Sequence, residues 1–521
     1  MKKRFCLWTV GLTILLVPLA TVVQSASSPE EAGITAVTGD LTPWRAYGAD
    51  MANYDNIWVI ALKNGSIVAF KLAMDMEQPG WLGGSEFLIF GPDGSQLTPL
   101  PISGSYDSTG APIPVCDYPS LGGAWGAFTH GAAADRTNGN GFVVHNQGQY
   151  AATLGWEFAD ELGDEAFTLV QLFNNDGTPR GTSINAFGTL TAEEGGYRDI
   201  GAVILSNGDI VAIGEDRQQS DDAKDAAGLV GGEAVVAVIL GPDGTQKKAP
   251  FLVHTDENGQ YIGTGNSSVV YQNIVAFDGG FMIDHGLGMR WYNNDGTPRT
   301  PSMPDHESLA GVELVEGFAF TFGTDSGGRG DSSMIASNGK DLVVKSVKVE
   351  SGNDAIGALI YYNVDGSVRN WVRFDESDLV NYYGLVDRTS VDMDENGNVF
   401  VVWQDGRFGE AEGELQIFGR FFDKNGNPHG GEFPVFKNYR TEPSVVDYGP
   451  YGQVPAGDIH QPRCAINSQV AAVMDGTTIV PGVPDLMKQL AKAFGLPLND
   501  PVLRIFENPL KPVDIQDWSI Y

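Results

Sequence analysis

The sequence predicts an all-β fold, a β-propeller of about seven four-stranded antiparallel blades, and two repeated turns carry this prediction. The first is an aromatic or aliphatic residue followed by a tight Asp-Gly or Asn-Gly turn; its copies begin at Phe90, Phe173, Leu240, Tyr292, Tyr362 and Phe422. The second precedes each copy, with its glycine at Gly65, Gly139, Gly208, Gly279, Gly339 and Gly397. Asp-Gly and Asn-Gly supply the positive φ angles that tight hairpins need, so each repeat should contain two β-hairpins.

The spacing of the repeats indicates how they pack. The glycines of the second turn lie 58 to 74 residues apart, which leaves room for four strands in each repeat. A single four-stranded unit cannot bury both of its faces, and stacking around a closed ring solves this with few exposed edges. A more divergent seventh copy fits residues 464–474 and 502–507, so six or eight blades stay open as alternatives. A linear β-solenoid is disfavoured because solenoid repeats are shorter.

The chain divides into four predicted segments. Residues 1–26 have a basic start, an apolar stretch and small residues at the end, which is the layout of a signal peptide. A retained membrane anchor is the alternative. A lead-in over 27–50, the propeller over 51–510 and a tail over 511–521 would follow. We therefore expect an exported protein in the periplasm, on the cell surface or outside the cell.

The last blade carries one departure from the β pattern. Residues 484–494 place Leu486, Leu490 and Phe494 at helical spacing between Pro484 and Gly495, which predicts a short amphipathic helix.

Charge and cysteine content limit the partners and the chemistry. The chain has 66 acidic and 32 basic residues, and a net charge of −34 disfavours nucleic acid as a partner. No stretch after the signal peptide is apolar enough for a transmembrane helix, and we expect a monomer. Cys6 leaves with the signal peptide. Cys116 and Cys464 could form a disulfide in an oxidising compartment or remain two buried free thiols.

Two stretches carry a resemblance to known proteins. Residues 391–407 (VDMDENGNVFVVWQDGR) and 419–428 (GRFFDKNGNP) resemble the repeats of secreted bacterial β-propeller proteins. The resemblance covers residues 50–510 at the level of architecture. It implies the propeller fold but no specific enzyme family.

Propeller topology predicts that one rim of the ring carries function. The tight turns should all lie on one rim, and the connections between hairpins and between blades should lie on the other. Examples of the long connections are residues 71–85, 147–164, 214–232, 301–331, 404–414 and 437–460. Loops on a rigid scaffold commonly carry binding sites, so the long-loop rim is the predicted site.

The candidate site residues come from these long loops. An acidic residue followed by an arginine recurs just after an inner strand in two blades, and aromatic side chains lie between the acidic stretches; the candidates are Glu215, Asp216, Arg217, Asp405, Arg407, Trp156 and Tyr382. Acidic loops could bind a cation or a cationic ligand, and aromatic rings could stack on sugars. The alternatives are a solvated surface, a structural ion pair and aromatic packing onto the blades.

Catalytic and metal-binding motifs are weak. Asp392, Asp394 and Asn396 have the spacing of a calcium loop, but the twelfth position of that pattern is Trp403, which favours a hairpin turn. The seven histidines show no metal-ligand spacing, and no nucleophile motif occurs. We predict no cofactor, and calcium is the one ion left open.

Three functions are compatible with this pattern. The first is a binding or scaffold module for an extracellular glycan or protein at the long-loop rim. The second is a carbohydrate-active hydrolase that uses carboxylates at the channel mouth, and the third is a structural cell-surface component. Because no catalytic motif is present, the sequence favours a protein that is not an enzyme.

Overall fold

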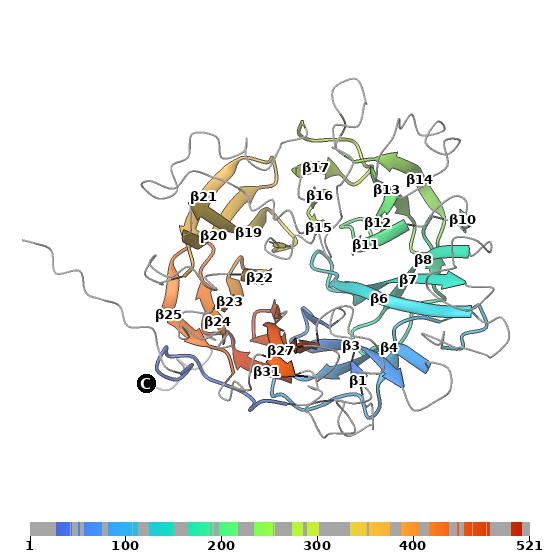
Figure 1. Ribbon diagram of the computed structural model, residues 1–521. Coiled ribbons are helices and arrows are strands. Elements are labelled where there is room, and N and C mark those ends of the chain that lie inside the picture. Colours follow the sequence, from blue (N-terminus) through green and yellow to red (C-terminus); the bar gives the residue numbers. More distant parts are fainter. Residues whose placement is uncertain are drawn as a thin grey trace, which may run out of the picture.

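Seven antiparallel sheets stand around a ring in the computed structural model (Figure 1). The structure describes residues 28–112, 124–150, 165–216, 234–255, 274–301, 334–375, 387–405, 416–436, 445–479 and 502–512, with short gaps inside several of these stretches. The prediction of seven blades is confirmed. The signal peptide over 1–26 and the helix over 484–494 lie outside the described residues. No helix in the described part of the chain is long and apolar enough to cross a membrane.

Each blade is a meander whose first strand lies nearest the middle of the ring (Figure 1). Blade 1 contains β2 (Trp58–Ala61), β3 (Ile67–Asp75), β4 (Leu82–Phe90) and β5 (Ile102–Ser103), with β1 (Met51–Ala52) paired to the end of β3. Blade 2 contains β6 (Ala124–Ala134), β7 (Phe142–Tyr150), β8 (Glu165–Phe173), β9 (Ile184–Asn185) and β10 (Leu190–Thr191). Blade 3 contains β11 (Tyr197–Ile204), β12 (Ile210–Asp216), β13 (Ala234–Leu240) and β14 (Gln246–Leu252).

The remaining blades follow the same order. Blade 4 contains β15 (Ile274–Phe277), β16 (Gly280–Asp284) and β17 (Met289–Asn293). Blade 5 contains β18 (Met334–Ser337), β19 (Leu342–Ser351), β20 (Asp354–Asn363) and β21 (Val368–Arg373). Blade 6 contains β22 (Asp387–Met393), β23 (Val399–Asp405), β24 (Gln416–Phe422) and β25 (Pro428–Pro434). Blade 7 contains β28 (Arg463–Ile466), β29 (Val470–Asp475) and β31 (Val502–Glu507), and a separate sheet contains β26 (Val445–Asp447), β27 (Gln453–His460) and β30 (Thr477–Ile479).

The four expected strand positions are present in blades 1, 2, 3, 5 and 6. Among the described residues, the sheets of blades 4 and 7 have three named strands each. In blade 4 the outer position is reduced to one isolated bridge between Tyr292 and Pro298. In blade 7 the outer position is filled from the other end of the chain.

The inner strands close the ring. Each of β2, β6, β11, β15, β18 and β22 contacts the inner strand of the following blade, and β28 returns to contact β2. Every blade of the described chain therefore has a neighbouring blade on each side.

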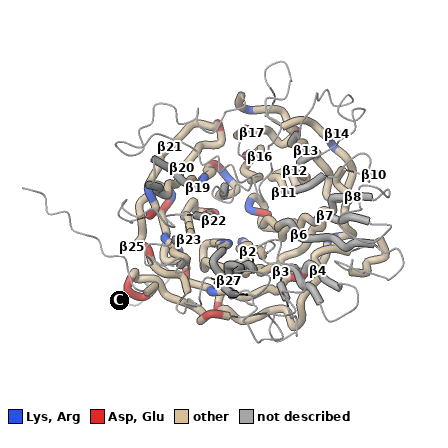
Figure 2. Tube along the Cα trace, in the orientation of Figure 1, with Lys and Arg blue, Asp and Glu red and all other residues tan. Residues whose placement is uncertain are grey.

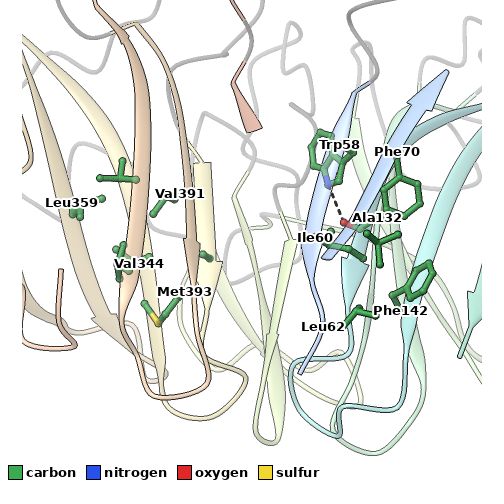
Figure 3. Packing of buried hydrophobic residues seen from close by; sticks show 14 of the residues in the cluster. Trp58, Ile60, Leu62, Phe70, Ala132, Phe142, Val344, Leu359, Val391 and Met393 are labelled. Atoms are coloured by element: carbon green, nitrogen blue, oxygen red, sulfur yellow. Dashed lines mark hydrogen bonds between the residues drawn. The ribbon is translucent and has the colours of Figure 1, made fainter. Parts of the chain in front are cut away.

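Apolar side chains fill the spaces between the blades. Between blades 1 and 2, Trp58 and Phe70 pack with Phe142, and the Trp58 indole N–H donates to the Ala132 carbonyl at 3.0 Å (Figure 3). The same cluster continues between blades 5 and 6, where its labelled members are Val344, Leu359, Val391 and Met393 (Figure 3). Strand residues alternate between the two faces of a blade, so every blade contributes to two such clusters.

Buried arginines reinforce three of these interfaces. Arg290, Arg420 and Arg504 lie on the third strands of blades 4, 6 and 7, each two residues before an aromatic residue over whose ring its guanidinium lies. Arg420 donates to the Phe374 carbonyl at 3.2 Å, directly after the outer strand of blade 5. The other two arginines make the equivalent bond to the carbonyls of Thr255 and Val435 in the preceding blade.

The start of the chain completes the last blade. Residues 35–41, which the sequence analysis assigned to the lead-in, exchange backbone hydrogen bonds with β31, including Val37 N–H to the Ile505 carbonyl at 2.9 Å. Ile34 is 1% exposed and packs in the cluster that contains Phe433 and Phe506. The ring is therefore closed by a strand that is separated from its partner by almost the whole sequence.

We expect Ile34→Ala to destabilise the folded protein by about 2–5 kcal/mol, because it leaves a cavity under the closing strand. Chemical denaturation of the mature protein measures this loss. Thr35→Ala is the matched control, since Thr35 is exposed on the same segment and its carbonyl still accepts from Glu507 N–H. Equal unfolding midpoints for the two variants would show that the closing strand adds nothing to stability.

Candidate functional site

One rim of the ring is built from the tight turns. The twelve predicted turn glycines all have positive φ, between 72° and 96°, as the Asp-Gly and Asn-Gly pattern predicts. Side chains and backbone groups of these turns form hydrogen bonds across each of the seven blade junctions. The bonds are Lys63 to the Thr137 carbonyl, Asn138 to the Leu205 carbonyl, Gly279 N–H to the Ser206 hydroxyl, Asp278 N–H to the Lys340 carbonyl, Lys340 to the Glu395 carbonyl, Asn398 to the Leu510 carbonyl and Asn467 to the Leu62 carbonyl.

A channel that is open to solvent runs along the middle of the ring. Residues of all seven inner strands line it, and most of them are alanine, valine or isoleucine. The polar residues of its described lining are Arg136, His145, Ser337, Asp392 and Cys464. Figure 2 shows that the inner strands are mostly uncharged, with a few acidic and basic segments near the middle of the ring.

One tight turn covers an end of this channel. Residues 135–140, called the stopper below, join β6 to β7 and belong to blade 2. Arg136 donates through Nη2 to Asp392 of blade 6 and through Nη1 to the Ile466 carbonyl of blade 7 at 2.8 Å. A Cβ atom on Gly339 of blade 5 would lie 2.3 Å from the Arg136 carbonyl oxygen. Because the stopper contacts blades on the far side of the ring, it lies across the axis at the tight-turn rim.

The stopper is held in shape by its own acidic residue. The Asp135 side chain is buried and accepts from the Thr137 hydroxyl and the Asn138 N–H, both at 2.9 Å. It also accepts from Asn140 N–H at 3.3 Å. This local network fixes the turn before Arg136 reaches across the channel.

The calcium-like sequence 392–397 forms a hairpin in which protein donors contact both carboxylates. Asp392 accepts from Arg136 and from Ile466 N–H, whereas Asp394 accepts from Asn396 N–H, Asn398 and Asn508. Burial raises the pKa of Asp392, and the charge of Arg136 acts in the opposite direction. This arrangement matches the predicted hairpin turn.

Buried polar pairs also join neighbouring blades. Asp284, the last residue of β16, forms an ion pair with Lys345 of β19 at 2.7 Å, with side chains 3% and 1% exposed. The Ser346 and Thr389 hydroxyls bond to each other at 2.9 Å. The free-energy cost of removing both charges from water offsets much of the attraction between them, so this ion pair is weak evidence for stability. It does show that a charged contact joins blades 4 and 5.

Sequence reasoning missed Asp284, Lys345 and Arg136. Asp284 and Lys345 are single charges at the end of an apolar stretch (Phe281–Ile283 and Leu342–Val344), and that contrast was the available signal. Arg136 sits in a connection, residues 135–141, that is two residues longer than its equivalents at 62–66 and 205–209, but nothing in its neighbours indicates a partner in blade 6.

The structure describes the backbone of three of the seven candidate site residues. Asp216 is the last residue of β12 and Asp405 is the last residue of β23, so both backbones lie at the rim opposite the tight turns, and Glu215 precedes Asp216 in the same strand. Arg217, Arg407, Trp156 and Tyr382 lie outside the described residues.

The two cysteines are also placed in part. Cys464 is a buried free cysteine in β28 whose thiol donates to the Phe400 carbonyl at 3.4 Å. This corresponds to the free-thiol alternative for Cys464. Cys116, its predicted disulfide partner, lies outside the described residues.

Comparison with known proteins returns structural similarity at low sequence identity. No family model matches the sequence, and no curated protein matches it. The chain is similar to the phage phi92 endosialidase (10% identity, 91% of this chain and 68% of that one, TM-score 0.39). It is also similar to the β-propeller domain of the Trilobed protease from Pyrococcus furiosus (9%, 82% and 91%, TM-score 0.36) and to an α-L-arabinofuranosidase from Podospora anserina (8%, 61% and 92%, TM-score 0.29).

The outer tight turns make stability sensitive to acid. Hydrogen bonds from the hydroxyl and N–H of the Ser or Thr two residues later hold the pKa of several turn residues below the usual range; four of them are Asp93, Asp176, Asp295 and Asp365. A lowered folded-state pKa means that the stabilisation is present above the unfolded pKa of about 4 and is lost as the pH falls through the folded pKa.

We expect the melting temperature of the wild-type protein to fall more steeply below about pH 4 than that of a variant with all four residues changed to Asn. Asn retains the oxygen acceptor of the turn but does not titrate. Thermal unfolding followed by circular dichroism between pH 7 and pH 2 makes the comparison. Parallel curves for the two proteins would rule out these four carboxylates as the source of acid sensitivity.

Proposed function

We propose that this protein is an exported binding or scaffold propeller that holds an extracellular glycan or protein at its long-loop rim. The observation that carries the proposal is the stopper over the opposite end of the channel. Arg136 lies across the channel at the tight-turn rim, and hydrogen bonds there join each blade to the next. A ligand would therefore approach the channel from its other end, between the long loops.

The described channel favours binding over hydrolysis. Glycosidases need two carboxyl groups about 5–10 Å apart on either side of the scissile bond. Asp392 is the one carboxylate in the described lining, and it is paired with Arg136 at the closed end. The hydrolase therefore remains an outcome of the test below, and so does a structural cell-surface role.

In the proposal, acidic residues at the ends of two strands supply the negative charge of the binding rim. Asp216 and Asp405 occupy the same position in blades 3 and 6, at the last residue of the second strand. Acidic groups repeated around a rim attract cations, so calcium would bridge the rim to hydroxyl-bearing ligands. Export is part of the proposal because residues 1–26 have the layout of a signal peptide.

A glycan array probed with the mature protein, with and without calcium, tests the proposal. We expect reproducible binding, and we expect the combined change Asp216→Asn and Asp405→Asn to weaken it at least about tenfold, since the proposal assigns both charges to the binding rim. Asp243→Asn is the matched control, because Asp243 lies in an outer tight turn of blade 3 on the other rim and Asn keeps the acceptor for Thr245 N–H.

The alternative outcomes are distinct. Equal loss of binding in Asp243→Asn would place the site on the tight-turn rim and contradict the proposal. Release of reducing sugar from bound glycans would identify a hydrolase. If no glycan binds in either condition, capture of a protein ligand by the wild-type protein but not by the double variant would support the protein form of the proposal, and capture by both would contradict it.

A further inference from the structure

The stopper joins blades that are not neighbours in the ring. Apart from it, the polar contacts at the tight-turn rim connect each blade to the next. Blade 2 is separated from blade 6 by three blades on one side and two on the other, yet Arg136 contacts Asp392 of blade 6 directly. This contact spans the channel instead of following the ring.

The contacts of Arg136 converge on one residue of blade 7. Arg136 donates to the carbonyl of Ile466, and the N–H of the same residue donates to Asp392 at 2.8 Å. Arg136, Asp392 and the backbone of Ile466 therefore each form a polar contact with the other two. The side chains of the ion pair are 14% and 17% exposed, so water is a poor substitute for either partner.

Blade 7 is the blade that most needs such a contact. Its inner strand β28 has only four residues, and its outer strand comes from the start of the chain. Its inner turn, residues 467–469, has no glycine, unlike the inner turns of the other six blades. The two ends of the chain meet in blade 7, and the inner strand β28 is hydrogen-bonded across the axis to Arg136 of blade 2.

We propose that Arg136 is a cross-ring latch, which holds β28 of blade 7 in the ring and closes the tight-turn end of the channel. The planar guanidinium is suited to this role because two of its nitrogens donate in fixed directions, one to Asp392 and one to Ile466. A lysine ammonium, as a point charge on a flexible chain, cannot hold both contacts with the same geometry. This role does not depend on which ligand the protein binds.

Hydrogen–deuterium exchange of the mature protein tests the latch. In Arg136→Ala we expect peptides over residues 463–475 to exchange at least about tenfold faster than in the wild-type protein, because the Asp392 carboxylate and the Ile466 carbonyl both lose the guanidinium that joins them. Peptides over residues 234–252 of blade 3 should keep their wild-type rates. Arg136→Lys should give an intermediate increase at residues 463–475.

Arg180→Ala is the matched control. Arg180 lies on the same rim of the same blade, is partly exposed and donates to the Asn140 carbonyl at 3.3 Å, so we expect its removal to leave exchange in β28 unchanged. If Arg136→Ala does not fold, Asp392→Asn replaces it, since Asn keeps an acceptor for Ile466 N–H and removes the charge. Exchange at residues 463–475 that stays at the wild-type rate, or that rises no more than at residues 234–252, would overturn the proposal.

Discussion

The whole structure depends on closing the ring. Each blade has two apolar faces, and each face is buried only if another blade covers it, so a gap at one junction would expose two faces at once. The contact between β28 and β2 removes that gap. The closing strand at residues 35–41 then adds a fourth strand to blade 7, which ties the two ends of the chain to one sheet.

Hydrogen bonds between blades fix the arrangement that apolar packing brings about. Burial of valine, isoleucine and aromatic side chains drives neighbouring blades together, but it does not fix their angle or height. Hydrogen bonds at the tight-turn rim fix one end of each junction. Farther from the axis, Arg290, Arg420 and Arg504 reach from a third strand to a carbonyl of the preceding blade. These contacts have direction, so they determine how the blades stand relative to one another.

The two rims differ in a way that bears on function. At one rim, the tight turns and the stopper form hydrogen bonds across every blade junction. At the other rim, strands end in acidic residues such as Asp216 and Asp405, and the long connections begin there. The buried Asp284–Lys345 pair lies on strands that run toward this rim. A rigid, closed base beneath variable loops is a common way to present a binding surface.

The sequence by itself determined the hairpins, a ring of about seven blades and the placement of tight turns on one rim. These features are local: an Asp-Gly or Asn-Gly turn and the strands beside it are encoded within about twenty residues. It also placed Asp216 and Asp405 at equivalent strand ends, because the turn glycine fixes the register of the strand that follows.

Only the tertiary structure decided how the ring is closed and locked. Arg136 and Asp392 are 256 positions apart, and Thr38 and Ile505, which are hydrogen-bonded, are 467 apart. Asp284 and Lys345 belong to different blades, so neither strand shows that the other charge exists. Contacts of this kind come from the circular arrangement of the blades. A pattern repeated along the chain specifies each blade, but the partner across the axis follows only once the ring is complete.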